Sequence, residues 1–274
     1  MSRRVTPTSD LDQLTDAILF NRKYRSLGLP RETVRSLLAQ SLTKTGNLRE
    51  AVDETRAKLH NIIAPYLGDP DYAAASLELA SLPPEADLRE FSRRMLASHA
   101  STRERLPLLP DFFPRLWEVT GVPHAILDLA CGLNPFALPW MALPTDCAYH
   151  AYDLHAPRVA LINAYLTHFK REPLAEVRDI LLDPPQIQAD VALFFKEAHR
   201  FEQREKGCNR AFWQALHVNW LLVSLPTENL TGTHSKLEQH RSLVRDTLSG
   251  LDWTVTEALF PGELVFCIRK PDGA

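Results

Sequence analysis

The amino-acid sequence predicts an α/β protein in which a parallel sheet ends in an antiparallel hairpin and an all-helical domain comes first. Three observations support this fold. Helical periodicity without any strand pattern fills the chain before residue 104, short apolar segments alternate with helices from about residue 123, and Pro261-Gly262 joins the last two strand candidates tightly. Alternating strands and helices are typical of parallel sheets, whereas a tight turn makes its two strands antiparallel. We therefore expect a helical domain over residues 1–104 and an α/β domain over residues 105–274.

Apolar residues recur at helical spacing throughout the first domain. The predicted helices cover residues 11–19, 32–42, 48–67, 72–82 and 85–97. Turn-forming residues at 28–30, 44–47 and 83–84 separate several of these helices. This part of the chain is therefore expected to form an all-helical module.

The second domain alternates between strand and helix patterns before its terminal hairpin. The predicted strands cover residues 125–129, 148–152, 191–195, 220–225, 253–260 and 263–269, and the helices 159–169 and 209–217. A parallel, doubly wound sheet closed by a C-terminal antiparallel hairpin is more typical of class I methyltransferases than of dehydrogenases. We therefore expect the Rossmann-like, seven-stranded sheet of a class I S-adenosylmethionine (SAM)-dependent methyltransferase.

Composition limits the compartment and excludes several kinds of site. The chain has 274 residues, of which 45% are hydrophobic and 24% charged, as in ordinary soluble domains. No apolar run approaches the roughly 18 residues of a membrane helix, and the N-terminus does not resemble a signal peptide. The four cysteines are scattered without a C-x-x-C pair, which favours a reducing compartment and argues against a zinc knuckle or disulfide framework. We expect a cytoplasmic monomer with no bound metal and no membrane association.

Charge is distributed unevenly along the chain. The net charge is −3, yet residues 1–60 contain 11 Lys/Arg and only 7 Asp/Glu. A basic region on an otherwise acidic protein indicates contact with a polyanion. Ordinary variation among solvated helix faces is the alternative, and charge alone does not decide between them.

The turn that follows the first predicted strand suggests a nucleoside-containing cofactor. Residues 128–140 read DLACGLNPFALPW, with one glycine where a dinucleotide fold has three. SAM has no pyrophosphate, so Gly132 alone can supply the close backbone turn. Asp153 ends the second strand 21 residues later, where an acid binds ribose hydroxyls, and Asp179 follows the next strand, where it would face adenine. A helix cap at Asp153 and a turn at Asp179 are the alternatives, but the three features in register favour a SAM site.

The sequence offers no obvious catalytic base or nucleophile, so no catalytic residue is assigned. Residues 183–185 (Asp-Pro-Pro) lack the following aromatic residue of the amine-methylase motif and precede the fourth strand. Residues 195–199 after that strand contain no nucleophilic cysteine, which disfavours covalent attack on a pyrimidine. A ring nitrogen with its own lone pair, such as guanine N7, needs no base, and orientation can supply most of the catalysis.

Residues 98–107 (SHASTRERLP) point to a specific family. Locally, Ser101 to Glu104 could be a capping box that opens a helix. Together with residues 128–135 and 139–141, however, this segment strongly resembles the aminoglycoside-resistance 16S rRNA methyltransferases, which modify guanine 1405 at N7 in the ribosomal A site. The resemblance covers essentially the whole chain, is dense from about 92 to 144, and is thin beyond 196.

The resemblance implies a partner, the 30S subunit with its 16S rRNA A site, and a role for individual residues. Arg105 should pair with the SAM carboxylate, for which a guanidinium is suited. The other implied cofactor contacts are Tyr72, His99, Ala100, Ser101, Ala130, Gly132, Asp153, Asp179, Ile180, Phe195 and Gln203. The implied RNA-binding residues are Arg22, Lys23, Arg25, Arg56, Lys58 and Lys236. Phosphate contacts of this kind position an enzyme without reading bases.

Two segments depart from the family pattern. Residues 197–202 differ from the sequence that relatives carry after the fourth strand, and the glutamine expected next is either Gln203 or replaced by Arg204. Residues 228–236 hold fewer positive charges than the basic loop of relatives. These departures leave two alternatives open: methylation of another A-site nucleotide, such as adenine N1, and a ribosome-binding factor without turnover. The residue that stacks on the target base is unassigned, since Phe136, Trp140 and Trp213 are all apolar enough to belong to the core.

Overall fold

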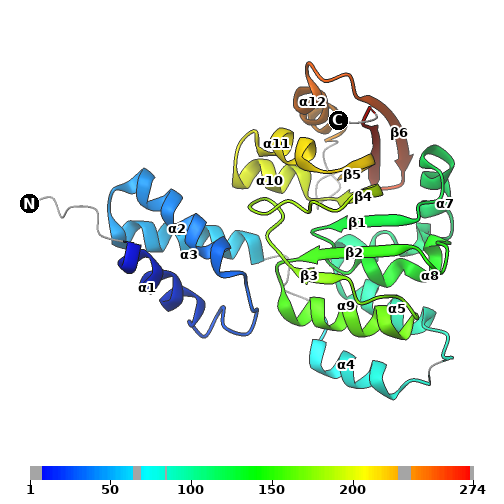
Figure 1. Ribbon diagram of the computed structural model, residues 1–274, viewed down its shortest axis with the longest axis horizontal. Helices are drawn as coiled ribbons and strands as arrows, with labels where there is room; N and C mark the ends of the chain where they lie inside the picture. The colour runs from blue at the N-terminus through cyan, green and yellow to red at the C-terminus, as the bar shows by residue number, and fades with distance from the viewer. Residues whose placement is uncertain (1–7, 64–68, 84, 228–235, 272–274) are drawn as a thin grey trace, which may run out of the picture.

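The computed structural model describes residues 8–63, 69–83, 85–227 and 236–271. Figure 1 shows a sheet covered by helices, with a bundle of three helices at one side. We call this bundle, residues 8–63, the three-helix module. Within the described ranges no helix is long and apolar enough to span a bilayer.

The sheet has the predicted topology. Its strands are β1 (Ala125–Leu129), β2 (Ala148–Asp153), β3 (Ala175–Val177), β4 (Ala189–Phe195), β5 (Val218–Pro226), β6 (Thr254–Phe260) and β7 (Glu263–Arg269). Their order is β3-β2-β1-β4-β5-β7-β6. The first five strands pair in parallel, while β7 runs antiparallel to both β5 and β6. The predicted seven-stranded class I fold with its C-terminal hairpin is confirmed.

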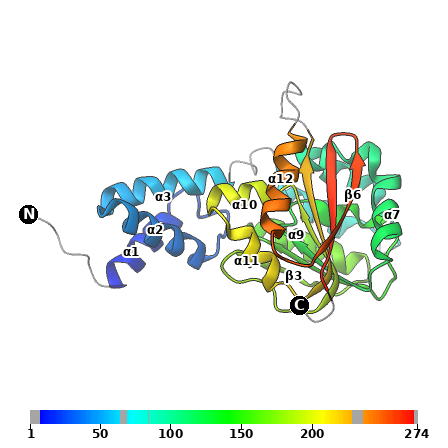
Figure 2. The same ribbon diagram turned by 90° about the horizontal axis from the view of Figure 1, so that it is seen from above.

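Helices cover both faces of this sheet. They are α4 (Tyr72–Ser81), α5 (Arg89–Ser98), α6 (Ala100–Arg103), α7 (Leu109–Thr120), α8 (Leu138–Met141), α9 (Ala156–His168), α10 (Ala198–Arg204), α11 (Cys208–Ala215) and α12 (Leu237–Leu248), with 3-10 turns at Leu106–Leu108 and Asn134–Ala137. Figure 2 shows α10, α11 and α12 on one side of the sheet and α7 on the other. Successive strand side chains point to opposite faces. Ile126 of β1 therefore joins the core beneath α4, α5, α7 and α9, whereas Leu127 joins the core beneath α10, α11 and α12.

The three-helix module has a core of its own. It consists of α1 (Thr8–Leu19), α2 (Arg31–Thr45) and α3 (Leu48–Ile63). Ile18, Val34, Leu38 and Leu59 are among its buried apolar residues. The next helices, α4 and α5, pack with the sheet instead. By its cores the chain therefore divides between α3 and α4, well before the boundary expected at residue 104.

Helix α7 was not among the predicted elements. Its sequence contains Pro110 in the first turn and Pro114 inside the helix, where proline removes a backbone hydrogen bond. Burial of Phe112, Phe113 and Trp117 against the sheet outweighs that loss. Tertiary packing thus overrides local propensity in this segment.

Candidate cofactor site

The strand order reverses at β1, which is flanked by β2 on one side and β4 on the other. In open α/β sheets, ligands bind outside the carboxyl ends of the strands at such a switch point. Two non-glycine residues there adopt the left-handed conformation, Ala130 (φ 50°) after β1 and Lys196 (φ 60°) after β4. Backbone conformations of this kind are uncommon and cluster at functional sites. The switch point is therefore the expected position of a ligand-binding site.

The loop after β1 is held against the end of β2. The backbone N–H of Gly132 donates to Asp153 Oδ2 at 3.0 Å, and that of Cys131 donates to the Tyr152 carbonyl at 2.9 Å. Gly132 has φ 54°, and a Cβ added to it would meet no atom within 4 Å. The loop thus presents a backbone turn to open space.

Asp153, the expected ribose ligand, lies at the centre of a buried ion-pair network. Its carboxylate accepts from the His155 backbone N–H at 2.9 Å and from Arg158 Nη1 at 2.8 Å. Arg158 also donates to Asp69 at 2.6 Å and to the Tyr72 hydroxyl at 2.9 Å. His155, not Asp153, is the N-cap position of α9, so the helix-cap alternative is not what the structure shows. Arg158, which sequence reasoning missed, brings Tyr72 into the Asp153 network.

Asp179, the expected adenine neighbour, is also buried and pairs with an arginine. Arg204 donates to both of its oxygens, at 3.0 and 2.6 Å, while Thr33 of α2 donates to Oδ2 at 2.9 Å. The Leu181 backbone N–H completes the set at 3.2 Å from Oδ1. Helix α10 turns Gln203 outward, where it is exposed. Arg204 rather than Gln203 therefore reaches this site, because adjacent helical residues point in different directions.

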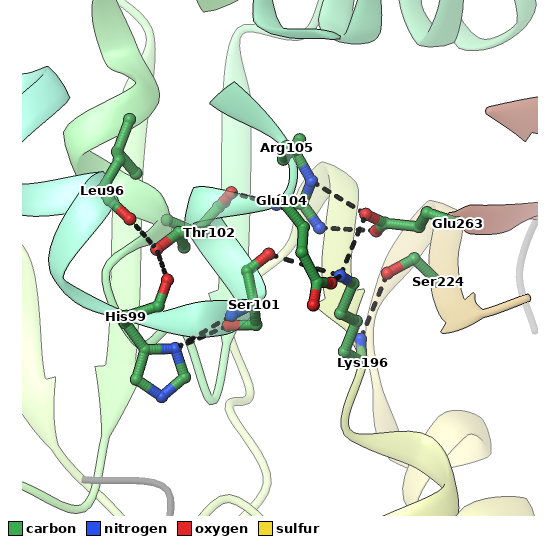
Figure 3. A network of polar contacts seen from close by, with 10 residues as sticks. Leu96, His99, Ser101, Thr102, Glu104, Arg105, Lys196, Ser224 and Glu263 are labelled. Atoms are coloured by element: carbon green, nitrogen blue, oxygen red, sulfur yellow. Dashed lines mark hydrogen bonds and ion pairs between the residues drawn. The ribbon is translucent and has the colours of Figure 1, made fainter. Parts of the chain in front are cut away.

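Arg105 marks the other end of the candidate site. Its Nε and Nη2 atoms donate to Glu263 at 3.1 and 2.5 Å, and the guanidinium lies over the rings of Phe112 and Phe195 at 4.5 and 4.6 Å. Figure 3 shows Glu263 along one edge of Arg105, with Lys196 also directed at the Glu263 carboxylate, 3.7 Å from Oε2. Burial opposes ionisation of Glu263, but the positive charges of Arg105 and Lys196 hold its pKa below the usual value. Arg105, which is predicted to bind the SAM carboxylate, is thus already paired with the carboxylate of Glu263.

A chain of buried hydrogen bonds extends from Arg105 into the sheet. Its Nη1 atom donates to Asn134 Oδ1 at 2.9 Å, and Asn134 Nδ2 donates to Asp128 at 3.0 Å. The Tyr149 hydroxyl donates to the same Asp128 oxygen at 2.6 Å. Burial raises the pKa of Asp128 to about 7. This series of hydrogen bonds fixes Arg105 relative to β1 and β2. Within it, the side-chain amide of Asn134 connects Arg105 to Asp128.

Helix α6 is anchored by Lys196. The ammonium group of Lys196 lies 2.8 Å from Glu104 and 3.3 Å from the Ser101 carbonyl (Figure 3). His99, not Ser101, is the N-cap of α6, and its Nδ1 lies 2.8 Å from the Ser101 hydroxyl. The capping-box alternative is therefore not observed, because Glu104 pairs with Lys196 instead of a backbone N–H. Ala100 is exposed beside these residues.

Glu197, the first residue that departs from the family pattern, belongs to the same region. A quarter of its side chain is exposed, yet surrounding protein raises its pKa to about 7, and its carboxyl interacts electrostatically with Arg200, Asp153 and Arg158. Its position two residues after the predicted strand 191–195 is a signal present in the sequence, because ligands bind at the carboxyl ends of parallel strands. Ile180, by contrast, is 3% exposed and packs into the core beneath α10.

The predicted RNA-binding residues fall into two regions. Arg22, Lys23, Arg25 and Arg56 are exposed on the three-helix module. Lys58, on the same module, is half-buried and pairs with Glu54 at 3.2 Å. Lys236 precedes α12 on the sheet domain, and the preceding loop residues 228–235 lie outside the described ranges.

Of the aromatic residues considered for stacking, two are core residues. Phe136 and Trp213 are 0% and 1% exposed. Trp140 is half-buried, with Arg93 over its ring at 5.7 Å. Of these three side chains, only Trp140 could therefore stack on a bound base without rearrangement of the core.

Comparisons with known proteins agree with this architecture. The family described as "Ribosomal RNA methyltransferase (FmrO)" matches residues 21–267. The 16S rRNA (guanine(1405)-N(7))-methyltransferase of Micromonospora echinospora is 33% identical over 236 residues, covering 84% of this chain and 85% of the relative. The enzyme of the same name from Frankia casuarinae is 30% identical over 270 residues, covering 95% and 94%.

Solved structures resemble the whole chain as well. The 16S rRNA methyltransferase RmtF, crystallised in complex with S-adenosyl-L-homocysteine, is 26% identical with a TM-score of 0.75, and the match covers 97% of this chain and 100% of that one. The 16S rRNA methylase RmtB has a TM-score of 0.78 at 24% identity over 95% and 98% of the two chains, a likeness of fold.

Proposed function

Because the chain belongs to the ribosomal RNA methyltransferase (FmrO) family, we propose that it methylates N7 of guanine 1405 in 16S rRNA with SAM as methyl donor, acting on the A site of the 30S subunit. Relatives with this activity in their names match most of both chains. The observation that carries the proposal is the switch point itself, where Gly132 faces open space and the buried acids Asp153 and Asp179 follow the next two strands.

The donor set of this site fits SAM. The Ala130–Gly132 backbone would lie under the methionine part, Asp153 would accept from the ribose hydroxyls, and loop 179–181 would border adenine. Arg105, with Ser101 and His99, would hold the amino-acid end. Because Glu263 occupies one edge of Arg105, a second carboxylate must share that guanidinium or displace Glu263. Phe195, directly under Arg105, would provide an apolar wall.

The chemistry requires positioning more than proton transfer. SAM, when bound, supplies a methyl group activated by a sulfonium. The lone pair of guanine N7 would accept this methyl group, and the electron pair of the C–S bond would leave on sulfur. N7 carries no proton, so no side chain has to remove one. The protein's part is to align N7 with the departing sulfur and to keep water from the reacting atoms.

The proposed product would account for resistance to aminoglycosides. Methylation fixes a positive charge and a methyl group on the base in the A site. Aminoglycosides are cationic, so repulsion and crowding would both weaken their binding. We propose that the enzyme works as a cytoplasmic monomer that confers aminoglycoside resistance, and that Arg22, Lys23, Arg25 and Arg56 contact rRNA phosphates through the three-helix module.

The test is primer extension across the A site of 30S subunits incubated with the protein and SAM. Borohydride–aniline treatment cleaves RNA at N7-methylguanine, so cleavage at guanine 1405 is the expected result. A primer-extension stop at a neighbouring adenine without aniline cleavage would replace the proposal with adenine N1 methylation. SAM binding with neither signal would replace it with a non-catalytic ribosome-binding role.

A further inference from the structure

The carboxylate of Asp179 has no free acceptor position. A carboxylate offers about four lone-pair positions. Arg204 fills two of them, the Leu181 N–H a third, and the Thr33 hydroxyl a fourth. Asp179 is 6% exposed and Thr33 is fully buried. The acid expected to recognise adenine therefore already ties three segments together: α2, α10 and its own loop.

The same module touches the chain just after the other acid, Asp153. Leu154 packs against the core of the three-helix module, and the Ala156 backbone N–H donates to the Leu27 carbonyl at 3.0 Å. Gly28, with φ 58°, lies so close that a Cβ on it would be 2.5 Å from the Ala156 Cβ. The module thus seats directly on the loops that follow β2 and β3.

We propose that Asp179 acts as a clamp between the three-helix module and loop 179–182, and that Thr33 is the positioning residue through which the module shapes the adenine side of the cofactor site. Adenine would then be met by the backbone of this loop and by Ile180, while the Asp179 carboxylate keeps its four donors. The Asp179 carbonyl accepts from the backbone N–H groups of Leu182 and Asp183, so a shift of Asp179 moves the whole loop.

A consequence is energetic coupling between the cofactor and the ribosome, which rests on the proposed function. The module carries the exposed basic residues proposed to dock on rRNA, and it holds the loop only when seated. A cofactor that binds better to the seated arrangement favours the orientation that docks, and docking strengthens cofactor binding by the same factor. The clamp itself does not depend on the identity of the RNA.

The test compares Thr33→Val with Thr33→Ser. Valine keeps the branched shape of threonine but cannot donate to Asp179, whereas serine can. We expect Thr33→Val to weaken binding of S-adenosyl-L-homocysteine by about 5- to 10-fold in calorimetry, which is within the usual range of coupling between sites. In kinetic measurements the variant should raise KM for SAM and leave kcat unchanged. Thr33→Ser should bind within about twofold of wild type. In the wild-type and serine proteins, S-adenosyl-L-homocysteine should strengthen 30S binding. In the valine variant this strengthening should be lost.

Thr43→Val is the matched control. Thr43 lies on the same helix, is exposed, and donates to the Ala39 carbonyl of its own helix. It should leave both binding constants unchanged, and a thermal melt of each variant reports on folding. Wild-type cofactor affinity in a folded Thr33→Val protein would overturn the clamp, as would an equal loss in Thr33→Ser. The cofactor measurement needs no ribosome, so failure of guanine 1405 methylation would reject the proposed function and leave this test intact.

Discussion

The two ends of the candidate cofactor site use the same chemistry but depend on different parts of the chain. At one end Arg105 pairs with Glu263, and both belong to the sheet domain and its preceding helices. At the other end Asp179 pairs with Arg204 and is also held by Thr33 of the three-helix module. The Arg105 end is therefore positioned within a single hydrophobic core, whereas the position of the Asp179 end depends on how the three-helix module packs against the sheet domain. Perturbing the module should therefore reach one end and spare the other.

The largest effect is expected at the Arg105 end. Arg105→Ala should lower methylation by about 100-fold or more by removing the guanidinium proposed to bind the cofactor, which primer extension measures. It should also destabilise the fold by about 3–5 kcal/mol, because Glu263 would be left buried without its main partner. Denaturant unfolding measures this second loss. An Arg105→Ala protein with normal SAM binding by calorimetry would reject the assignment.

A double variant separates binding from folding at this end. Arg105→Gln with Glu263→Gln removes both charges and keeps hydrogen-bonding groups at both positions. It should recover most of the unfolding free energy lost in Arg105→Ala, yet bind SAM as weakly. If the double variant bound SAM normally, Arg105 would be a structural residue of the hairpin contact and not a cofactor ligand.

The next largest effect is expected at the Asp179 end of the site. Gly28→Ala should push the module away from α9, since the new Cβ would collide with Ala156. Cofactor affinity should fall by up to about tenfold through the Asp179 loop, as expected for coupled sites. Calorimetry with S-adenosyl-L-homocysteine measures this change. The Arg105–Glu263 pair lies in a different part of the chain and should be unaffected.

Gly46→Ala is the control for backbone strain. Gly46 has φ 65°, close to that of Gly28, but an added Cβ there meets nothing within 4 Å. Both variants therefore carry the roughly 1 kcal/mol cost of alanine in a left-handed conformation, and only Gly28→Ala adds the collision. Equal cofactor affinities in the two variants would mean that module seating does not reach the site.

The comparison also shows what the sequence could and could not predict. The strand ends, Asp153 and Asp179 were foreseeable because acids after parallel strands meet at one edge of the sheet. Of their partners, Arg204 was one of two alternatives left open, and Arg158 and Thr33 were not foreseen, because a pattern of apolar spacing does not reveal which polar side chain turns inward. Gln203 and Arg204 illustrate this, since one residue of difference on a short helix decides between solvent and Asp179.

The helical domain shows the same limit. Periodicity predicted α1 to α5 but not that α4 and α5 would join the core of the sheet. Amphipathic helices show which side is buried, not against what. Likewise Pro114 disguised α7, whose packing only the folded chain reveals.

A smaller effect is expected at the exposed basic residues of the three-helix module, which are proposed to bind RNA and not to shape the cofactor site. Charge reversal of Arg22 and Lys23 to Glu should weaken 30S binding by about 10-fold at low salt and reduce its salt dependence, because phosphate contacts release counterions. Both residues are exposed and neither donates to Asp179, so calorimetry should show unchanged SAM binding. Arg245→Glu, on α12 of the sheet domain, provides an exposed control. A variant with wild-type 30S affinity and an unchanged salt dependence would remove the docking role from this surface.

The smallest expected effect concerns Glu197, whose carboxyl interacts electrostatically with Asp153. Burial raises its pKa from 4.5 to about 7, so the folded protein holds this proton more tightly than the unfolded chain. The resulting stability is fully present below pH 4.5 and is lost as pH rises through 7. Glu197→Gln should therefore raise the melting temperature at pH 8 by about 2–6 °C and have little effect at pH 4.5. Thermal melts across this range measure it, with Glu205→Gln as an exposed control. An equal shift at both pH values would show that the gain comes from packing of the amide and not from the buried charge.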